Sequence, residues 1–486
     1  MSQNTTSAGW KKQSGYIWSM IGSAVGFANI LSFSACAYKN GGGAFLIPYA
    51  AALILLGVPL LLLEGRVGSH WKLPLVGAFG KVLGSTGKTV GWLAVIACGT
   101  IGGFYIVLTG YSVAYTWFAA TSVIPADTAT FFTRDFLQIS PSLFDVGSFS
   151  WPVFIATGVV AIFSWIVLTK DIKDGVEKIS SIVMPLLAII MFIFAMVVSL
   201  LPGGIDGMIR FLTPDFSKLT DITLWRDVFG QLLFSLSLGL GLIVGYSRHT
   251  NERIDVVKAM KWVAIGDFSV SFIAGCAIFG AVAHMSAITG TPFNEIITSD
   301  STFEIGFVIF PKILQQFGAF APIIGTIFFF SVFIAGVTGV FSIIESVAGN
   351  IEVEYATTRK QAVMVTMILH ILLAMLFSTG CSSHLIDALA PMLLGTNMLF
   401  GSLMLITAFV FLCPDIGIHF KRSPIRHIVP LFLFIIFVGN LQQEFASLNA
   451  ASYVRWGWFV GAIVVSMGLT YYSKKIPNKE RVYVSA

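Results

Sequence analysis

Long apolar stretches separated by short polar ones are the dominant pattern of this sequence. A helix needs roughly 20 apolar residues to cross a bilayer, and twelve stretches reach or approach that length. Only the seventh contains an acidic residue, Asp267. The pattern predicts an all-α integral membrane protein with twelve transmembrane helices. The stretches lie between Lys12 and Lys39, Lys39 and Glu64, Lys88 and Asp127, Asp145 and Lys170, Lys178 and Asp206, Asp227 and Arg248, Lys261 and Glu295, Lys312 and Glu345, Lys360 and Asp387, Asp387 and Asp415, Arg426 and Glu444, and Arg455 and Lys474.

The charges between these stretches predict an orientation. If the amino terminus is cytoplasmic, 22 of the 29 lysines and arginines lie on the cytoplasmic side. Because short cytoplasmic loops are enriched in basic residues, both termini are predicted in the cytoplasm, with the chain in the plasma (inner) membrane. The first apolar stretch is too long for the core of a signal peptide, so no cleavage is expected.

Composition excludes several classes of function. Hydrophobic residues make up 56% of the chain and charged residues 11%, against about 25% charged in soluble proteins. The net charge of +5 comes without a basic cluster interleaved with aromatic residues, so no nucleic-acid partner is expected. The five cysteines are scattered, which predicts neither a disulfide framework nor a zinc site. The seven histidines show no HExxH pattern, and there is no nucleophile elbow, so an enzyme is not expected.

Two apolar stretches are interrupted at mid-depth by glycines and polar residues. The first reads GSAVGFAN over 22–29, and the sixth reads FSLSLGLG over 234–241. Irregular backbone is tolerated in a bilayer only where protein or a polar cavity satisfies its hydrogen bonds. A matched pair of such interruptions in two halves of a chain is typical of a transporter with its binding site halfway through the membrane. The alternative is that these glycines only allow neighbouring helices to pack closely.

These residues resemble the neurotransmitter:sodium symporter family, in particular its bacterial amino-acid branch, typified by the leucine transporter. The resemblance rests on Gly22 to Asn29, on NGGGAFLIPY over 40–49 and on Gln231 to Gly241. It implies twelve helices, a 5+5 inverted repeat and broken helices 1 and 6. The implied organisation is a cytoplasmic segment 1–13, first repeat 14–200, extracellular loop 201–225, second repeat 226–412, helices 11 and 12 over 413–473 and a cytoplasmic tail 474–486.

The resemblance also implies two sodium sites. The first would use Ala24, Asn29, Ser235 and Asp267, and the second Gly22, Val25, Ala335 and Thr338. Gly339 lacks the hydroxyl or acid that many relatives place after the threonine, so one or two sodium ions per cycle both remain open, and a proton on Asp267 could replace one. The fixed carboxylate of Asp267 predicts that no chloride is required.

The substrate site implied by the resemblance is apolar where it would hold a side chain. Tyr105 and the exposed half-helix of the first span would hold a carboxylate, and Ser237 an ammonium group. Gly26 stands where amine-transporting relatives have an aspartate, which favours an α-amino acid. The implied lining residues are Ala24, Gly26, Ala28, Ile101, Tyr105, Phe234, Ser235, Ser237, Leu240, Gly339 and Ile343.

The gates are where the sequence departs most from the family. Ser32 replaces the arginine that would pair with Asp387 outside, while Trp10 is present inside without its arginine. Lys11, Lys12, Glu352 and Glu354 are candidate substitutes for the inner ion pair, and Glu64 is expected to cap amides of the sixth span. The sequence thus predicts a sodium-coupled importer of a neutral, aliphatic or aromatic L-amino acid, working by alternating access. The alternative is a non-transporting amino-acid receptor or pseudo-transporter with a weakened second sodium site.

Overall fold

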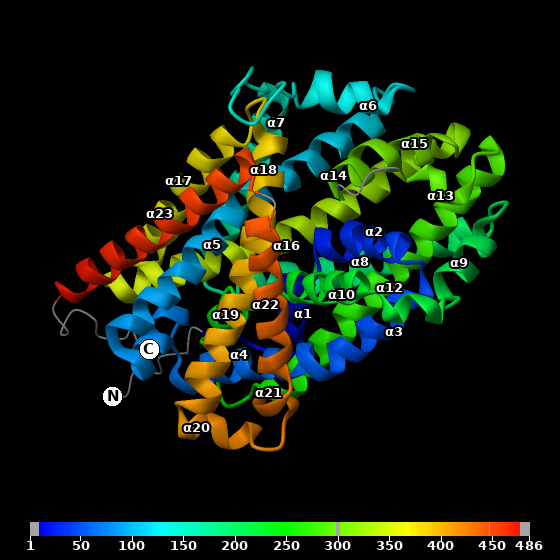
Figure 1. Ribbon diagram of the computed structural model, residues 1–486. Coiled ribbons are helices and arrows are strands. Elements are labelled where there is room, and N and C mark those ends of the chain that lie inside the picture. The colour runs from blue at the N-terminus through cyan, green and yellow to red at the C-terminus, as the bar shows by residue number, and fades with distance from the viewer. Residues whose placement is uncertain (1–8, 298–301, 447, 477–486) are drawn as a thin grey trace.

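The computed structural model describes residues 9–297, 302–446 and 448–476, so parts of the predicted terminal segments 1–13 and 474–486 lie outside the described residues. Within these ranges the regular structure is helical, apart from one isolated β-bridge between Phe149 and Thr379 (Figure 1). The first half contains α1 (Gln13–Ala24), α2 (Phe33–Lys39), α3 (Gly43–Ala52), α4 (Val58–Trp71), α5 (Leu75–Ala120), α6 (Thr128–Thr130), α7 (Trp151–Leu168), α8 (Val176–Ser199), α9 (Gly204–Leu212), α10 (Ile222–Ser235) and α11 (Leu242–Ser247).

The second half contains α12 (Val256–Thr289), α13 (Phe293–Ile296), α14 (Thr302–Glu304), α15 (Phe310–Gln315), α16 (Ala321–Tyr355), α17 (Arg359–Leu376), α18 (Ser382–Ala390), α19 (Met398–Ile406), α20 (Pro414–Gly417), α21 (Pro424–His427), α22 (Val429–Ala446) and α23 (Ala450–Lys474). Short π-helical segments join several of them: η1 (Ala28–Ser32), η2 (Leu53–Gly57), η3 (Phe131–Phe136), η5 (Ile305–Ile309), η7 (Pro391–Asn397) and η8 (Thr407–Phe411). The 3-10 segments are η4 (Phe216–Thr220), η6 (Gly318–Phe320) and η9 (Ile418–Phe420).

Among the described residues, nine helical segments are long and apolar enough to cross a membrane, and a bent pair formed by Gln13–Ala24 and Ala28–Lys39 makes a tenth. Two of the twelve expected stretches, the sixth and the twelfth, are not among these segments. The sixth is divided between α10 and α11, which have 14 and 6 residues. The twelfth, α23, has 25 residues but includes many tyrosine, tryptophan, glycine and hydroxyl-bearing positions.

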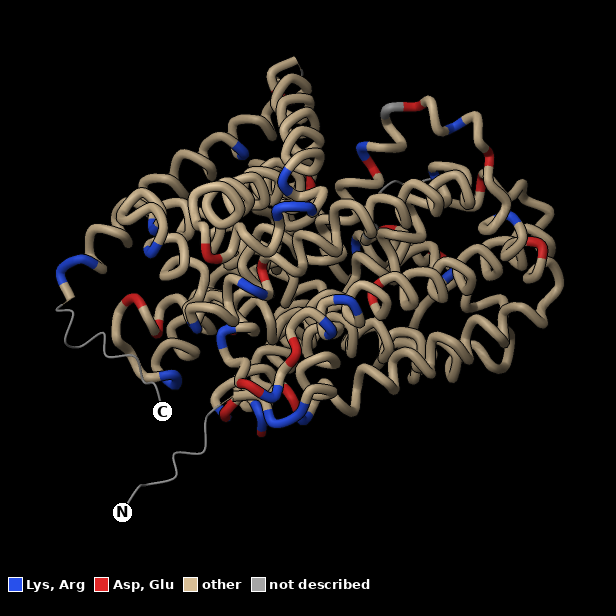
Figure 2. The backbone as a smooth tube through the Cα atoms, turned by 90° about the horizontal axis from the view of Figure 1, so that it is seen from below, with Lys and Arg blue, Asp and Glu red and all other residues tan. Residues whose placement is uncertain are grey.

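The centre of the bundle is formed by α5 and α16, which pack against each other along much of their length (Figure 1). The periphery carries exposed apolar side chains, as at Ile182, Ile189 and Phe192 on α8. Such a surface is unfavourable in water and suits contact with lipid. Figure 2 shows that charged positions are sparse along the helices. The chain is therefore a membrane-embedded helical bundle.

The two glycine-rich stretches are the places where apolar helices end early. Helix α1 ends at Ala24 with an extended Val25, and the helix resumes at Ala28 at an angle of 60° to α1. Helix α10 ends at Ser235, and Gly239 and Gly241, both with φ of +80°, precede α11. Left-handed backbone is accessible to glycine without the steric cost that other residues carry. Gly239 and Gly241 thus allow the chain to take this conformation between α10 and α11.

Candidate functional site

A cluster of polar side chains is buried where η1, α10, α12 and α3 meet. The Asn29 amide group donates to Asp267 Oδ1 at 2.7 Å, to Ser235 Oγ at 2.9 Å and to Ser271 Oγ at 2.9 Å. Its Oδ1 accepts a hydrogen bond from the Gly26 backbone N–H at 2.9 Å. One asparagine therefore connects the interruption after α1 to the end of α10 and to α12. The group Asn29, Tyr49, Ser235, Asp267 and Ser271 is called the Asp267 cluster below.

Asp267 is the charged centre of this cluster and is fully buried on α12. Its Oδ1 also accepts a hydrogen bond from Ser235 Oγ at 2.7 Å, and its Oδ2 faces the Tyr49 hydroxyl at 3.5 Å. A buried carboxylate is tolerated only when hydrogen bonds or opposite charges compensate its lost hydration. The structure therefore brings Asn29, Ser235 and Asp267 into direct contact.

A small inner cavity of about 30 Å³ lies beside this cluster, between the two interruptions. That volume holds one or two water molecules, so an amino acid would fit only after side chains move. The sequence-predicted residues that line the cavity are Ala24, Gly26, Ala28, Ile101, Tyr105, Phe234, Ser237, Leu240, Gly339 and Ile343. Ser235 instead faces Asp267. Ser23, Leu242, Ser342, Leu394 and Met398 complete the lining and were not anticipated.

Tyr105 of α5 occupies the space that two glycines leave open. A side chain at Gly26 would collide with the Tyr105 hydroxyl, and a Cβ added at Gly339 would lie 2.7 Å from it. The ring also packs edge-on against Phe27, with ring centroids 5.1 Å apart. A residue larger than glycine at position 339, such as one that carries the missing hydroxyl, would therefore displace Tyr105.

The residues expected at a second sodium site lie where α1, α16 and α8 meet. A Cβ added at Gly22 would be 3.0 Å from Thr338 Cβ and 3.2 Å from Met184 Sδ. The Thr338 hydroxyl donates to the carbonyl oxygens of Ala335 and Ile334, each at 3.1 Å. Val25 follows the last residue of α1. Gly22 and Thr338 are therefore direct neighbours across the α1–α16 contact.

Side chains from other helices satisfy the exposed backbone of the interruptions. Glu64 of α4 accepts a hydrogen bond from the Gly239 N–H at 2.8 Å, which confirms the predicted capping role. Gln231 donates from Nε2 to the Ala28 carbonyl at 2.7 Å. These contacts replace hydrogen bonds that a continuous helix would make internally.

A larger cavity of about 580 Å³, called the outer cavity below, lies next to the inner cavity. Phe234 and Leu394 line both cavities and so form the partition between them. Ser32 and Asp387 line the outer cavity, but the Ser32 hydroxyl donates to Gln231 Oε1 at 2.7 Å. Ser32 is thus bonded to Gln231, and no arginine stands at position 32 to pair with Asp387.

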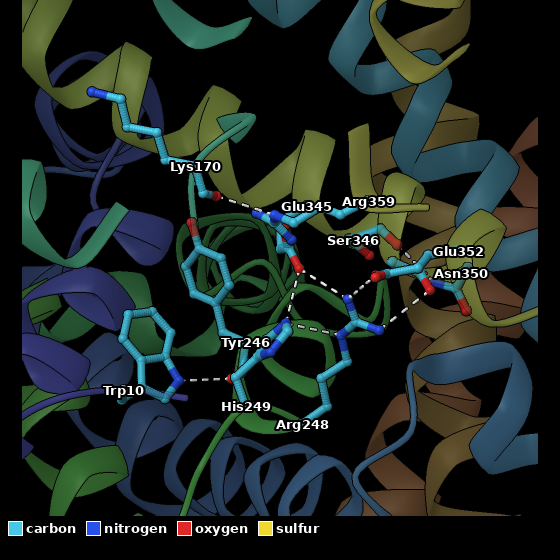
Figure 3. A network of polar contacts seen from close by, with 11 residues as sticks. Trp10, Lys170, Tyr246, Arg248, His249, Glu345, Ser346, Asn350, Glu352 and Arg359 are labelled. Atoms are coloured by element: carbon cyan, nitrogen blue, oxygen red, sulfur yellow. Dashed lines mark hydrogen bonds and ion pairs between the residues drawn. The ribbon is translucent and has the colours of Figure 1, made fainter. Parts of the chain in front are cut away.

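At the opposite end of α1, Trp10 packs against the link between α11 and α12. Its Nε1–H donates to the Tyr246 carbonyl at 2.9 Å, and its backbone N–H donates to the His249 carbonyl at 3.2 Å (Figure 3). The segment Lys11–Lys12 contributes backbone N–H groups, which donate to Glu177 at 2.7 and 3.1 Å.

The suggested inner ion pairs of Lys11 and Lys12 with Glu352 and Glu354 are wrong. Glu352 instead pairs with Arg248 at 2.8 Å, and Glu354 pairs with Lys88 at 2.6 Å. Arg248 and Lys88 lie far from Lys11 in sequence, so only the folded chain reveals these partners.

Known proteins resemble this chain over most of its length. The sequence profile described as "Sodium:neurotransmitter symporter family" matches residues 7–130 and 124–472. An uncharacterized sodium-dependent transporter of Methanocaldococcus jannaschii is 32% identical over 382 residues, covering 78% of this chain and 76% of that protein. A second, of Haemophilus influenzae, is 26% identical over 369 residues, covering 74% and 77%. The sodium-dependent dopamine transporter of Bos taurus is 24% identical over 526 residues, covering 96% and 74%.

Proposed function

Because this chain belongs to the sodium:neurotransmitter symporter family and is a transporter rather than an enzyme, we propose that it imports a neutral, hydrophobic L-amino acid together with sodium. The observation that carries the proposal is the inner cavity between the two interruptions, which adjoins the Asp267 cluster. Alternating access requires both routes to this cavity to close in turn. The proposal includes the full architecture of twelve helices, two inverted repeats and cytoplasmic termini.

The Asp267 cluster has the chemistry of a first sodium site. Sodium is a small, hard cation that binds amide, hydroxyl, carbonyl and carboxylate oxygens, all of which occur here. An ion between Asn29, Ser235 and Asp267 would take the oxygens that now accept hydrogen bonds among these side chains. The Ala24 carbonyl and the substrate carboxylate would complete its coordination. The shared carboxylate would couple the two binding events, since each ligand raises the affinity for the other by the same factor.

The lining of the inner cavity supports the proposed substrate class. Ile101, Leu240 and Ile343 present apolar surface, and the Tyr105 hydroxyl and Ser237 supply polar contacts. A carboxylate would be bound by Tyr105 and the amides at the start of η1, and an ammonium group by Ser237 and nearby carbonyls. Gly26 leaves no acidic group for the amine of a monoamine. We therefore favour an aliphatic or aromatic amino acid over an amine such as dopamine.

The fixed negative charge of Asp267 supports transport without chloride. A carboxylate held by Asn29, Ser235 and Tyr49 supplies beside the cation the charge that a bound anion would otherwise provide. In this proposal Ser271 serves only as a hydrogen-bond partner of Asn29.

The number of sodium ions sets the concentration ratio that the transporter can sustain. Gly22, Val25, Ala335 and Thr338 are the proposed ligands of a second ion, with one side-chain oxygen fewer because of Gly339. One charge crossing about 100 mV releases about 2.3 kcal/mol, which supports roughly fifty-fold accumulation of a zwitterion, and two charges support about the square of that ratio. The steady-state ratio at a known voltage therefore distinguishes one ion from two.

Closure outside would depend on the Phe234–Leu394 partition, with Tyr105, Ser32 and Asp387 nearby. Closure inside would depend on the docking of Trp10 and the ion pairs around it. The two sides differ in chemistry, because the outer partition is apolar and the inner contacts are polar and charged.

The test is uptake into proteoliposomes containing the purified full chain. Each of the twenty common amino acids, and dopamine as a comparator, is offered with and without an inward sodium gradient. The expected result is sodium-dependent accumulation of one or a few hydrophobic amino acids, with affinity lowered by Tyr105→Phe. Sodium-dependent uptake of dopamine but of no amino acid would overturn the substrate class.

The alternative is a receptor that binds an amino acid without moving it, which the absent outer ion pair and Gly339 motivate. Counterflow separates the two functions, because a transporter exchanges external labelled substrate for internal unlabelled substrate and a receptor does not. Binding without counterflow would favour the receptor.

A further inference from the structure

One buried carboxylate on α16 collects three nitrogen-bearing side chains from two other segments. Glu345 has no exposed side-chain surface, and its Oε1 lies 3.2 Å from Arg248 Nη2 and 3.0 Å from His249 Nε2. Its Oε2 lies 2.9 Å from Arg359 Nη1 (Figure 3). Removing a partner from a buried charge is strongly destabilising, because the remaining charge is left without compensation. These contacts therefore fasten the α11–α12 link and the start of α17 to α16.

The charges around His249 balance when its imidazole is neutral. Glu345 and Glu352 on α16 face Arg248 on the same segment as His249 and Arg359 at the start of α17. Beyond them, Lys72 at the end of α4 donates to the carbonyl and hydroxyl of Thr250, the residue after His249. The Tyr246 ring on α11 is a further titratable group beside Glu345 (Figure 3). A proton on His249 would add a third positive charge to a set of two carboxylates and two guanidinium groups.

The Nε2 atom of His249 has two partners, one of which requires it to accept a hydrogen bond and the other to donate one. Arg248 Nε–H points at this nitrogen from 3.0 Å as a donor, while Glu345 Oε1 lies 3.0 Å away as an acceptor. A single ring nitrogen either accepts or donates a hydrogen bond. Without a proton, Nε2 accepts from Arg248 and faces a carboxylate oxygen. With a proton, it donates to Glu345 and loses the bond from Arg248.

His249 also holds the chain segment that precedes α1. Its carbonyl accepts the Trp10 N–H, while Asn251 Nδ2 donates to the Trp10 carbonyl at 2.9 Å and Trp10 Nε1–H donates to Tyr246. The imidazole and the backbone of one residue thus connect the ion pairs of α16 to the docking of Trp10.

We propose that His249 is a proton-binding positioning residue: its neutral form holds the segment before α1 against α11 and α16, and protonation releases that segment and opens the inner side. The proposal rests on the proposed transport function, in which this end of α1 separates from α16 to release cargo to the cytoplasm. Acidification of that compartment then favours the inward-open state. No residue of the substrate or ion sites takes part.

The direction of the pH effect follows from burial and charge. His249 lies outside the membrane-spanning helices; burial, followed by the positive charge of Arg248, lowers its pKa in this arrangement, although its bonding to Glu345 opposes the change. Once the segment opens, the imidazole is hydrated and its pKa returns toward about 6.5. The closed arrangement therefore binds a proton less tightly than the open one. It is most stable above about pH 6.5 and loses stability as the pH falls below that value.

The experiment measures opening directly in the full-length protein, without any cargo. A cysteine reporter replaces Ser19, a buried residue of α1, in a version whose native cysteines are changed to alanine. Its maleimide labelling is followed from pH 5.5 to 8.0 and divided by the labelling of the denatured protein at the same pH. The expected result is a rise on acidification that begins near pH 6.5 and approaches tenfold for each unit by which the pKa differs between the two states.

Variants at the same position separate the proposal from a merely structural role. His249→Gln, which cannot take up the proton, is expected to give low labelling at every pH, and His249→Lys high labelling at every pH. The control His384→Gln changes a histidine of α18, which contacts the Ser140 carbonyl and not the Glu345 ion pairs, and should keep the wild-type profile. If His249→Gln does not fold, His249→Asn serves in its place, with helix content and monodispersity as the check.

A pH profile that persists in the glutamine or asparagine variant, or a flat wild-type profile, would overturn the proposal. Because the labelling needs no substrate, failure of amino-acid uptake with this profile intact would count against the proposed function alone.

Discussion

Replacing Asp267 by asparagine is expected to weaken sodium binding and to create a requirement for chloride. The change removes the charge of the Asp267 cluster while nearly preserving the shape of the side chain. Asn29 and Ser235 now donate to the carboxylate. In the variant they would face an amide, which has one acceptor oxygen and one donor NH₂ group. A chloride ion near Tyr49 and Ser271 could restore the lost negative charge.

The size of the effect follows from the two shortest contacts. Both donors lie 2.7 Å from Asp267 Oδ1, and hydrogen bonds to a charged group contribute about 1.5–3 kcal/mol each. The neutral amide keeps part of this interaction, so we expect a net loss of about 1.4–2.8 kcal/mol from the sodium-bound state. Since about 1.4 kcal/mol is a factor of ten, the half-saturating sodium concentration should rise tenfold to a hundredfold, in order of magnitude.

The assay is amino-acid uptake or binding at varied sodium, with chloride or gluconate as the anion. Wild type should respond equally in the two salts, whereas Asp267→Asn should recover activity only in chloride. Asp387→Asn, which neutralises a carboxylate of the outer cavity, is the matched control and should leave anion dependence unchanged. An Asp267→Asn protein with unchanged sodium affinity in both salts would refute the reasoning.

Three other substitutions probe the partition, the glycine pocket and the cap. Gly339→Ser should lower substrate affinity several-fold in competition binding, because its Cβ would press on Tyr105; overpacking commonly costs about 1–3 kcal/mol. Leu394→Ala should speed dissociation of bound substrate by thinning the partition, and an unchanged rate would place closure elsewhere. Glu64→Leu should cost about 1–3 kcal/mol and lower the melting temperature, since the Gly239 N–H loses its acceptor, while Glu64→Gln keeps one and should be milder.

Features of the membrane architecture that depend on local sequence could be predicted. Charge-free apolar runs predict helices because a bilayer leaves the backbone few alternatives. Glycine at positions 239 and 241 permits the positive φ of the segment between α10 and α11. Glu64 could be assigned as a cap because a buried acid beside exposed amides has an evident partner. The family resemblance supplied positions, and the structure supplies their contacts.

Features that depend on tertiary contacts could not be predicted. Leu394 and Met398 line the inner cavity, yet an apolar residue on an apolar helix carries no sign of which neighbour it faces. The glycines of the sixth stretch predict an interruption, but the pattern does not give the residues at which α10 ends and α11 begins. The inner ion pairs were mispredicted for a related reason: proximity in sequence to Trp10 suggested Lys11 and Lys12, whereas Arg248 reaches Glu345 and Glu352 through the fold.

The contrast between the two closures bears on how such a transporter would be regulated. An apolar partition such as Phe234 and Leu394 responds to what fills the cavities beside it, since its stability depends on excluding water. A buried ion cluster responds in addition to protons and to any change in the charge of one member, because each charge is balanced by specific partners. Outer closure is thus suited to sensing cargo and inner closure to sensing the compartment that receives it. On this argument, substrate concentration should govern opening to the outside, and pH should act chiefly on the inner side through His249.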